Sequence, residues 1–362
     1  QEFTIKSVNK SRYHWITGAF VFRQTINRKV DLSRFTDTTR HLTNSGIPTQ
    51  GIAFYHQSTL DLLQGLSCSV GLRYDYEHAR CDFSKVQQPL NGNGETKSLE
   101  QFNRSLHFGQ FTPRFSMQYL SAHNQSFYAS VSKGYKAGGF NVSFLNNDDY
   151  LYSPEYNWNY EIGTKLSFLN NRLSADLSLF YIDWRNQQIT NTIPTVGNVI
   201  RNAGRSRNKG IEASFQARPT KSWMMYMNYG YTDARFVHYQ KEERGILKDY
   251  EGNYLPMVPR HTFSLTTGYS FYDICSWIDR LTLNAGVSVT GPIYWYEHNQ
   301  AKQSPYALVN LRISINKGCF TWEAWSKNLT NTDYLSYYFV TSKAYAQKGK
   351  PITLGTSVSI SL

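Results

Sequence analysis

The sequence predicts an all-β protein, an antiparallel transmembrane β-barrel, from three observations. Hydrophobic and polar residues alternate over many segments, these segments are long, and short connections between them alternate with long ones. In residues 281–290, one set of alternate positions is Leu, Leu, Ala, Val and Val, and the other is Thr, Asn, Gly, Ser and Thr. A β-strand places the two sets on opposite faces, whereas a helix would mix them.

Fifteen strands follow from this alternation, and many are about 10 to 14 residues long, whereas strands of soluble proteins average nearer five or six. They are residues 2–7, 13–24, 49–62, 67–80, 111–120, 125–136, 156–168, 173–187, 207–217, 222–235, 260–271, 279–290, 305–316, 319–328 and 350–362. Aromatic residues such as Trp223 and Tyr231 lie near the ends of the apolar sets, which is typical of the aromatic girdles of outer-membrane barrels. A soluble sandwich would also have apolar faces, but it would explain neither the strand length nor the girdles.

The connections between these strands differ in length. Short ones are residues 9–12, 64–66, 170–171, 219–221 and 317–318, and long ones are 25–48, 81–110, 137–155, 188–206, 236–259, 291–304 and 329–349. Outer-membrane barrels have short periplasmic turns and long outer loops, and only a closed sheet leaves no unpaired edge in lipid. Because bacterial single-chain barrels have an even number of strands, we expect at least one strand before residue 1, unless a strand near 98–110 has been missed.

Composition excludes several other classes. The chain has 362 residues, a net charge of +12 and 15% aromatic residues, which is not the composition of a disordered protein. No apolar run approaches the roughly 18 residues of a transmembrane helix. The sequence begins with Gln1 and shows no signal segment, so we expect a processed chain or a fragment. The four cysteines suggest neither a zinc site nor a disulfide scaffold, although a Cys68–Cys81 bridge stays possible.

Five motifs in order resemble one family. The first is SVSKGYKAGGFN at 130–141, with Lys133, Gly134, Tyr135, Lys136, Gly139 and Asn141 at its characteristic positions. The others are PE at 154–155 with YEIGTK at 160–165, FYIDWRNQQI at 180–189, NAG at 202–204 with KGIE at 209–212, and a final segment with Asn328, Leu329, Asn331 and Tyr334. Over residues 12–362 the chain resembles the barrel of TonB-dependent outer-membrane receptors, which import ferric siderophores, haem, cobalamin and some glycans. We expect most of these motif residues to determine the fold rather than to bind ligand, because Gly at a strand end relieves crowding.

The resemblance implies a larger protein than residues 1–362. Such receptors have about 22 strands and a globular plug in the lumen. The plug and the segment that engages the TonB complex lie N-terminal to the barrel in this family, so residues 1–362 are expected to be a partial barrel from which the plug and the first strands are missing. The expected location is the outer membrane of a Gram-negative bacterium. Barrels of this kind often end in Phe or Trp, and Leu362 departs from that pattern.

Candidate functional residues form two sets. Loop-side residues expected near a ligand are Tyr150, Tyr152, Trp184, Arg201, Arg205, Tyr294, Trp295, Tyr337 and Tyr338. Residues expected to face the plug from the lumen are Arg73, Asp75, Glu77, Arg114, Glu161, Lys165 and Arg312. Many further cations fall in the predicted outer loops, namely Arg28, Lys29, Arg34, Arg40, Lys241, Arg244 and Lys248. They could meet lipopolysaccharide and other outer-membrane lipid, or they could attract an anionic metal-chelate ligand such as a ferric siderophore.

Other functions fit less well. Nucleic acid binding is not expected, because the aromatic residues fall mostly on the lipid-facing set. The sequence has no metal-ligand spacing, no phosphate-binding loop and no nucleophile elbow, so we expect no metal, no cofactor and no enzyme. The main alternative to a receptor is a passive pore or an adhesin barrel without a plug, and a membrane-anchored hydrolase with a smaller barrel is less favoured.

Overall fold

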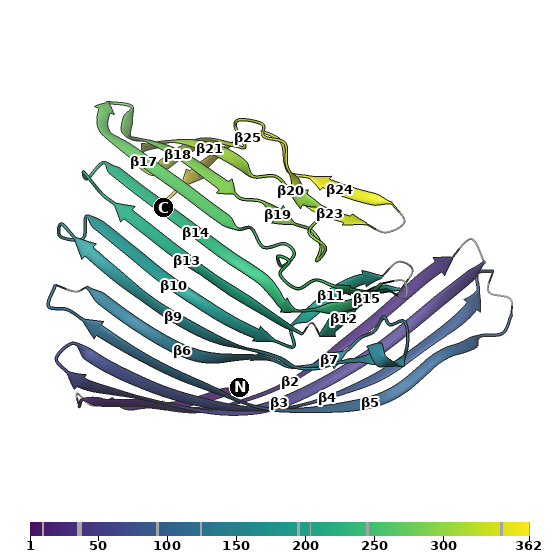
Figure 1. Cartoon of the computed structure of the whole chain (residues 1–362). Helices are drawn as coiled ribbons and strands as arrows, with labels where there is room; N and C mark the ends of the chain where they lie inside the picture. Colours follow the sequence, from purple (N-terminus) through teal and green to yellow (C-terminus); the bar gives the residue numbers. More distant parts are fainter. Residues whose placement is uncertain are drawn as a thin grey trace. The chain divides into compact units, whose positions relative to one another are not determined.

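A single large sheet dominates the fold (Figure 1). The computed structural model describes residues 1–8, 11–34, 38–91, 94–123, 125–193, 196–202, 204–243, 246–340 and 343–361. The strands of the sheet, in spatial order, are β1 (Glu2–Lys6), β2 (Tyr13–Arg34), β3 (Thr39–Leu63), β4 (Leu66–Pro89), β5 (Lys97–Leu120), β6 (Ser126–Lys136), β9 (Glu155–Phe168), β10 (Leu173–Arg185), β13 (Arg205–Ala217), β14 (Trp223–His238), β17 (His261–Cys275), β18 (Ile278–Thr290), β21 (Tyr306–Lys317), β22 (Phe320–Lys327) and β25 (Thr353–Ile360). This 15-stranded antiparallel sheet confirms the predicted all-β class and the strand count.

Strands β2 to β5 extend much further than predicted. The long loops expected at residues 25–48 and 81–110 are wrong over most of their length, because β2 and β3 stay paired from Tyr13↔Leu60 to Arg34↔Thr39. Residues 98–110 are the first part of β5 rather than an additional strand. In the extension of β4 the apolar residues Ala79, Cys81 and Phe83 lie on the face that carries Arg73 and Asp75 lower on the strand, whereas the face of Leu72 and Tyr76 becomes polar. The alternation therefore changes face part-way along the strand while the backbone pairing continues, so the pattern indicates an earlier end of the strand than the structure has.

The chain divides into two compact units. Unit 1 is Gln1–Ser116, Val131–Trp158 and Trp184–Ala203, and unit 2 is Met117–Ser130, Asn159–Asp183 and Gly204–Leu362. Unit 1 contains the small pair β7–β8 (Gly139–Phe140 and Leu151–Tyr152), the 3-10 helix η1 (Asn147–Tyr150) and the hairpin β11–β12 (Gln188–Ile193 and Gly197–Asn202). Unit 2 contains the pairs β15–β16 (Gln240–Glu243 and Ile246–Asp249), β19–β20 (Ile293–Tyr294 and Lys302–Gln303) and β23–β24 (Leu335–Val340 and Ala344–Lys348).

The short turns have the backbone that tight hairpins need. Asn170 and Asn171 have φ of 56° and 65°, and Gly65 and Gly318 have φ of 81° and 53°. These left-handed conformations favour Gly and Asn, so the predicted turns at 64–66, 170–171 and 317–318 follow directly from local sequence. Of the other predicted features, part of the turn at 9–12, Ala203, Arg244, Leu362 and the side chain of Arg34 lie outside the described residues.

The two faces of the sheet in unit 1 differ in chemistry. One face of β3 and β4 carries exposed apolar side chains, including Phe54 at 55% exposure, Leu72 and Tyr76. We call the opposite face the inner face, and on β4 it carries Arg73, Asp75 and Glu77. Further along the inner face of the same strand, Ala79, Cys81 and Phe83 form a buried core with Phe140 of β7. The loop that follows β6 therefore packs on the inner face.

All four cysteines are free thiols. The alternative of a Cys68–Cys81 bridge is wrong, because both residues lie on β4, thirteen positions apart. At about 3.3 Å per residue, their Cα atoms are roughly 43 Å apart, far beyond the reach of a disulfide. Among the described residues, no helix is both long enough and apolar enough to span a membrane.

Candidate functional site

One buried amide joins the glycine-rich motif to a distant hairpin in unit 1. The Asn141 side-chain Nδ2 donates to the carbonyl oxygens of Asp149 and Ile200, both at 2.8 Å. Its Oδ1 accepts from the Ile200 backbone N–H at 2.8 Å. Asn141 thus uses both donors and its acceptor to hold the loop around η1 against β12.

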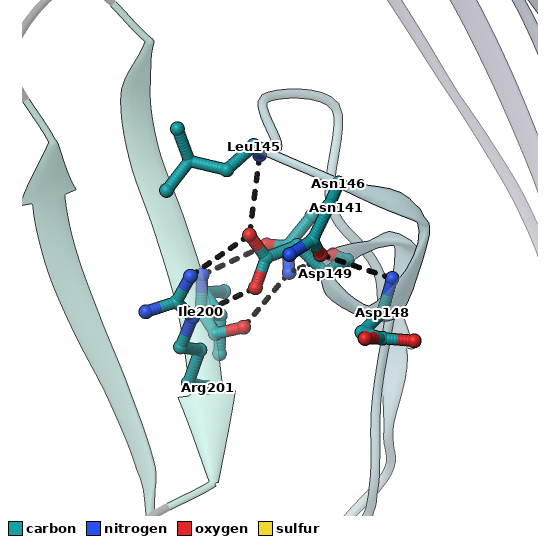
Figure 2. Close-up of polar contacts among 7 residues, drawn as sticks. All are labelled: Asn141, Leu145, Asn146, Asp148, Asp149, Ile200 and Arg201. Atoms are coloured by element: carbon teal, nitrogen blue, oxygen red, sulfur yellow. Dashed lines mark hydrogen bonds and ion pairs between the residues drawn. The ribbon is translucent and has the colours of Figure 1, made fainter. Parts of the chain in front are cut away.

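An ion pair adds a second link between the same two segments, as Figure 2 shows. Arg201 Nε donates to Asp149 Oδ1 at 2.7 Å and Arg201 Nη2 donates to Asp149 Oδ2 at 2.9 Å, which is the bidentate geometry that favours arginine. Asp149 Oδ2 also accepts from the Leu145 N–H at 3.1 Å. The hydrogen bonds from Arg201 and from the backbone N–H groups of Leu145 and Asn146 hold the pKa of Asp149 below its usual value, although burial acts in the opposite direction. We call Asn141, Asp149 and Arg201 the outer clamp.

The base of the β11–β12 hairpin is fixed by further polar contacts. Asn202 Oδ1 accepts from the Ser153 N–H at 2.8 Å, and its Nδ2 donates to the carbonyls of Ser153 and Asn186 at 2.9 and 2.7 Å. Gln188 Nε2 donates to the Ala137 carbonyl at 2.8 Å, and the Gln188 N–H donates to the buried Glu155 carboxylate. The three motif segments near 137, 154 and 188 therefore meet at one place.

The motif glycines permit close packing at this junction. A Cβ at Gly138 would lie 2.4 Å from the Tyr152 carbonyl oxygen, and a Cβ at Gly139 would lie 2.4 Å from the Tyr152 hydroxyl. A Cβ at Gly134 would meet the Asn157 side chain at 2.9 Å. Tyr152 is a predicted ligand-binding residue, but in this structure its ring covers Gly139.

Aromatic side chains pack under the outer clamp. Tyr150 is 3% exposed, stacks on Phe102 with ring centroids 4.6 Å apart and meets Phe144 edge-on at 4.5 Å. The Arg104 guanidinium lies 4.9 Å from the centre of the Tyr150 ring. Burial, helped by a hydrogen bond to Glu100, raises the pKa of Tyr150 to about 12. Tyr150 is therefore a neutral core residue that packs beneath the outer clamp.

A cavity of about 490 Å³ adjoins this aromatic cluster in unit 1. Its walls include the cations Arg28 and Lys85, together with His41, and the apolar side chains of Phe83, Val142 and Phe144. None of the lining residues that the structure describes is Asp or Glu. In volume it falls within the range of ligand pockets, roughly 300 to 1,000 Å³. Sequence reasoning named Arg28 only as one of many loop cations and did not find Lys85, Phe83 or Phe144.

Unit 2 has its own basic and aromatic cluster, centred on Tyr254. The guanidinium groups of Arg235 and Arg260 lie 4.1 and 4.8 Å from the centre of the Tyr254 ring, and Tyr294 stacks on that ring at 5.4 Å. Arg235 also donates to Asp233 at 2.8 Å and to the Tyr254 hydroxyl. The predicted residue Tyr294 is thus part of this cluster, whereas Tyr254 and Arg235 were not predicted.

The remaining loop-side candidates have different environments. Trp295 is buried at 6% exposure and has Tyr337 and Tyr338 around its ring, at centroid distances of 6.4 and 6.5 Å. Arg205 is paired with Asp183 in unit 2. Trp184 belongs to unit 1, and its buried indole N–H has no hydrogen-bond partner among the described residues. Among these candidates, Tyr337 of unit 2 has an exposed ring, at 42% exposure.

The predicted plug-facing residues lie on the strands, several in local pairs. Arg73 donates to Asp75 at 2.7 Å, and its guanidinium lies 5.8 Å from the centre of the Tyr55 ring. Glu161 accepts from the Tyr128 hydroxyl at 2.6 Å, and Arg312 lies 3.9 Å from Glu323. Glu77 is half-buried, and Arg114 and Lys165 are exposed.

The last motif also forms a polar junction, in unit 2. Asn328, with φ of 48°, donates through Nδ2 to the carbonyls of Thr332 and Lys350, both at 3.0 Å. Asn331 Oδ1 accepts from the Ile352 N–H at 3.0 Å, and Tyr334 stacks on Tyr306 at 4.4 Å. Leu329 is exposed. Among the residues the structure describes, no three His, Cys, Asp or Glu side chains form a group that could hold a metal.

Comparison with known proteins identifies the family. Residues 4–331 match the model of the TonB dependent receptor-like β-barrel. The chain belongs to this family. It is 24% identical over 300 residues to the probable TonB-dependent siderophore receptor PiuA of Acinetobacter baumannii, a match that covers 80% of this chain and 38% of PiuA. It is 24% identical over 241 residues to the ferrichrome outer membrane transporter/phage receptor of Escherichia coli K12, covering 65% of this chain and 30% of that protein.

Solved structures agree on the fold. The ferric yersiniabactin uptake receptor FyuA of Yersinia pestis superimposes with a TM-score of 0.81 at 18% identity, over 99% of this chain and 53% of FyuA. The chain therefore spans about a third of the length of its curated relatives and about half of this structural neighbour. As a β-barrel of this family, it resides in the outer membrane of a Gram-negative bacterium, and the family is one of transport receptors.

Proposed function

We propose that this chain is the larger part of the barrel of a receptor that imports a ferric siderophore with energy from the TonB complex. Family membership supports receptor activity, and the names of several relatives point to siderophores. The observation that carries the proposal is the inner-face surface of unit 1, where Arg28, Lys85 and aromatic rings line a cavity beside the outer clamp. Cations and rigid rings suit the capture of a large anion from dilute solution.

In this proposal the barrel supplies a rigid wall, and a plug outside residues 1–362 closes the lumen and contacts TonB. The apolar face with Phe54, Leu72 and Tyr76 meets lipid, and the inner face with Arg73, Asp75 and Glu77 meets the plug. Arg201 pairs with Asp149 between two loop segments, and Arg205 pairs with Asp183 between β13 and β10. The proposed role of these two arginines is to position local structure. Tyr294, Tyr337 and Tyr338 are proposed to contact ligand from unit 2.

Outer-leaflet lipid is proposed as a second partner. On the face opposite the inner face, Arg23 of β2 pairs with Gln50 of β3, and Gln50 pairs with His78 of β4. The His78 and His107 rings stack with centroids 4.5 Å apart, and the Tyr76 hydroxyl lies 3.0 Å from His107 Nδ1. Arg23 is the cation of this row, and a cation near lipid-facing aromatic side chains suits the phosphates of lipopolysaccharide.

The test is uptake of radioactive iron by a strain that depends on this receptor, with and without a working TonB complex. Candidate carriers are ferric siderophores of several chemical classes, with haem and cobalamin as alternatives. We expect uptake from a ferric siderophore that stops when TonB is removed. Entry of small solutes at the same rate without TonB would instead support the passive pore, and uptake of haem or cobalamin alone would replace the siderophore.

A further inference from the structure

We infer that the cavity in unit 1 is a subsite for a polyanionic metal chelate whose ligands are aromatic rings, such as a tris-catecholate, rather than for an uncharged chelate. This inference rests on the proposed import of a ferric chelate and specifies its chemical class. The cavity is formed by the extensions of β2, β3 and β4 and closed by segments 142–144 and 196–198.

Strand pairing places the two cations on the same face of the sheet, on β2 and β4, with β3 between them. Arg28 pairs with Ser45 and Ser45 pairs with Phe83, while Val30 pairs with Thr43 and Thr43 with Lys85. Arg28 and Lys85 are thus two strands apart and two positions out of step. With about 4.8 Å between strands and 3.3 Å per residue, their Cα atoms are roughly 12 Å apart. A chelate lying between them could meet both.

The charged side chains that line the cavity are both cationic. Among the described residues, its walls carry Arg28 and Lys85 and no carboxylate, and neither cation has an ion pair. The nearby acid Asp31 lies on the opposite face of β2 and is paired with Arg40. Elsewhere in the unit, cations such as Arg201 and Arg73 are neutralised by Asp149 and Asp75. The positive charges of Arg28 and Lys85 are therefore available to an anion that enters the cavity.

Apolar and aromatic side chains line much of the rest of the cavity. Phe83 is 3% exposed and lies against Phe144, with ring centroids 5.2 Å apart, and both rings line the cavity with Val142. Thr43, Ser143 and Asn198 add polar groups at the edge. Flat aromatic ligand arms can pack on these rings while the charge of the chelate faces Arg28 and Lys85. An uncharged chelate would leave both cations without a partner.

Three substitution-inert chromium(III) complexes distinguish the contribution of the ligand's charge from that of its aromatic rings. They are the trianionic tris-catecholate, the trianionic tris-oxalate and an uncharged trihydroxamate. Binding to the receptor purified from outer membranes is measured by equilibrium dialysis. We expect the tris-catecholate to bind most tightly, the tris-oxalate less tightly and the trihydroxamate least. Arg28→Gln or Lys85→Gln should weaken binding of both trianions by about tenfold, the effect of losing one charge-assisted contact.

Lys29 provides a matched control, because it follows Arg28 directly on β2 and points to the opposite face. Lys29→Gln should leave binding unchanged, and Arg28→Lys should retain most of it. Equal losses from Arg28→Gln and Lys29→Gln would overturn the subsite, and equal affinity for tris-oxalate and tris-catecholate would overturn the aromatic part. If the receptor imports only an uncharged ferric chelate, this inference fails and the proposed function stands. If it imports no ferric chelate, the proposed function fails.

Discussion

Arg201 and Asp149 form a bidentate ion pair between a hairpin and a loop that are 52 residues apart in sequence. The carboxylate is 6% exposed as a side chain and the guanidinium 34%, so the pair lies at the edge of the protein interior. Asn141 lies between the same segments and bonds to both. The outer clamp therefore fixes one wall of the proposed ligand cavity, because segment 142–144 follows Asn141 directly.

Breaking this ion pair should loosen the hairpin locally. Arg201→Gln leaves the Asp149 carboxylate buried without its cation, which typically costs about 3 to 5 kcal/mol. We expect faster hydrogen exchange at the amides of Leu145 and Ile200 and unchanged exchange in β2 and β3. The matched control is Lys317→Gln, which breaks the exposed pair with Asp279 and should cost less than about 1 kcal/mol. Equal and small effects of the two variants would show that the clamp does not hold the hairpin.

The same pair predicts a pH dependence. Because the pKa of Asp149 is lowered in the folded state, its contribution to stability is fully present above the unfolded value, near 3.9, and is lost as pH falls through the folded value. Protection of the Ile200 amide should therefore stay constant from neutral pH to about pH 4 and fall at lower pH. In Asp149→Asn this acid-induced loss should be absent. Hydrogen exchange at several pH values, corrected for intrinsic rates, measures it.

The sequence predicts the sheet better than the site, because a strand is indicated by residues close together in the sequence whereas the site depends on residues far apart. Apolar and polar residues alternate along 281–290, and β18 forms there as expected. The partner of Arg201 lies 52 residues away, and no local pattern indicates Asp149. The motif did draw attention to Asn141, but its bonds to Ile200 depend on where two loops meet.

The extensions of β2 to β5 show the same limit. Lipid imposes a one-sided apolar pattern only where a strand crosses the membrane. Beyond it, Lys29 and Asn44 still pair in the sheet, but the apolar residues, such as Val30 and Phe83, now lie on the inner face. The cavity walls at Arg28 and Lys85 belong to these extensions, so residues that sequence analysis assigned to loops line the proposed subsite.

The two motif glycines should differ in how they tolerate a methyl group. At Gly138 the new Cβ would meet a backbone carbonyl at 2.4 Å, which cannot move without the loop, whereas at Gly139 it would meet the end of the Tyr152 side chain. We expect Gly138→Ala to lower the thermal midpoint and the amount of folded receptor more than Gly139→Ala. The cost at Gly138 should be about 1 to 3 kcal/mol, as for other overpacked sites.

A third glycine serves as the control for that comparison. The nearest atom to a Cβ at Gly286 would be 3.6 Å away, an ordinary contact. Gly286→Ala should therefore leave the thermal midpoint nearly unchanged or raise it slightly. The explanation from packing fails if Gly138→Ala is as stable as Gly286→Ala in the same membrane preparation.

The inner face should retain the plug in the complete receptor. Replacing Arg73, Glu77 and Arg114 together by Ala removes three charged groups from that face, each of which can form charge-assisted hydrogen bonds of about 1.5 to 3 kcal/mol. We expect normal assembly but several-fold greater sensitivity to antibiotics too large for ordinary porins. Arg80→Ala, on the opposite face of β4, is the control and should change neither. Unchanged antibiotic entry through the triple variant would contradict a plug-holding role for these residues.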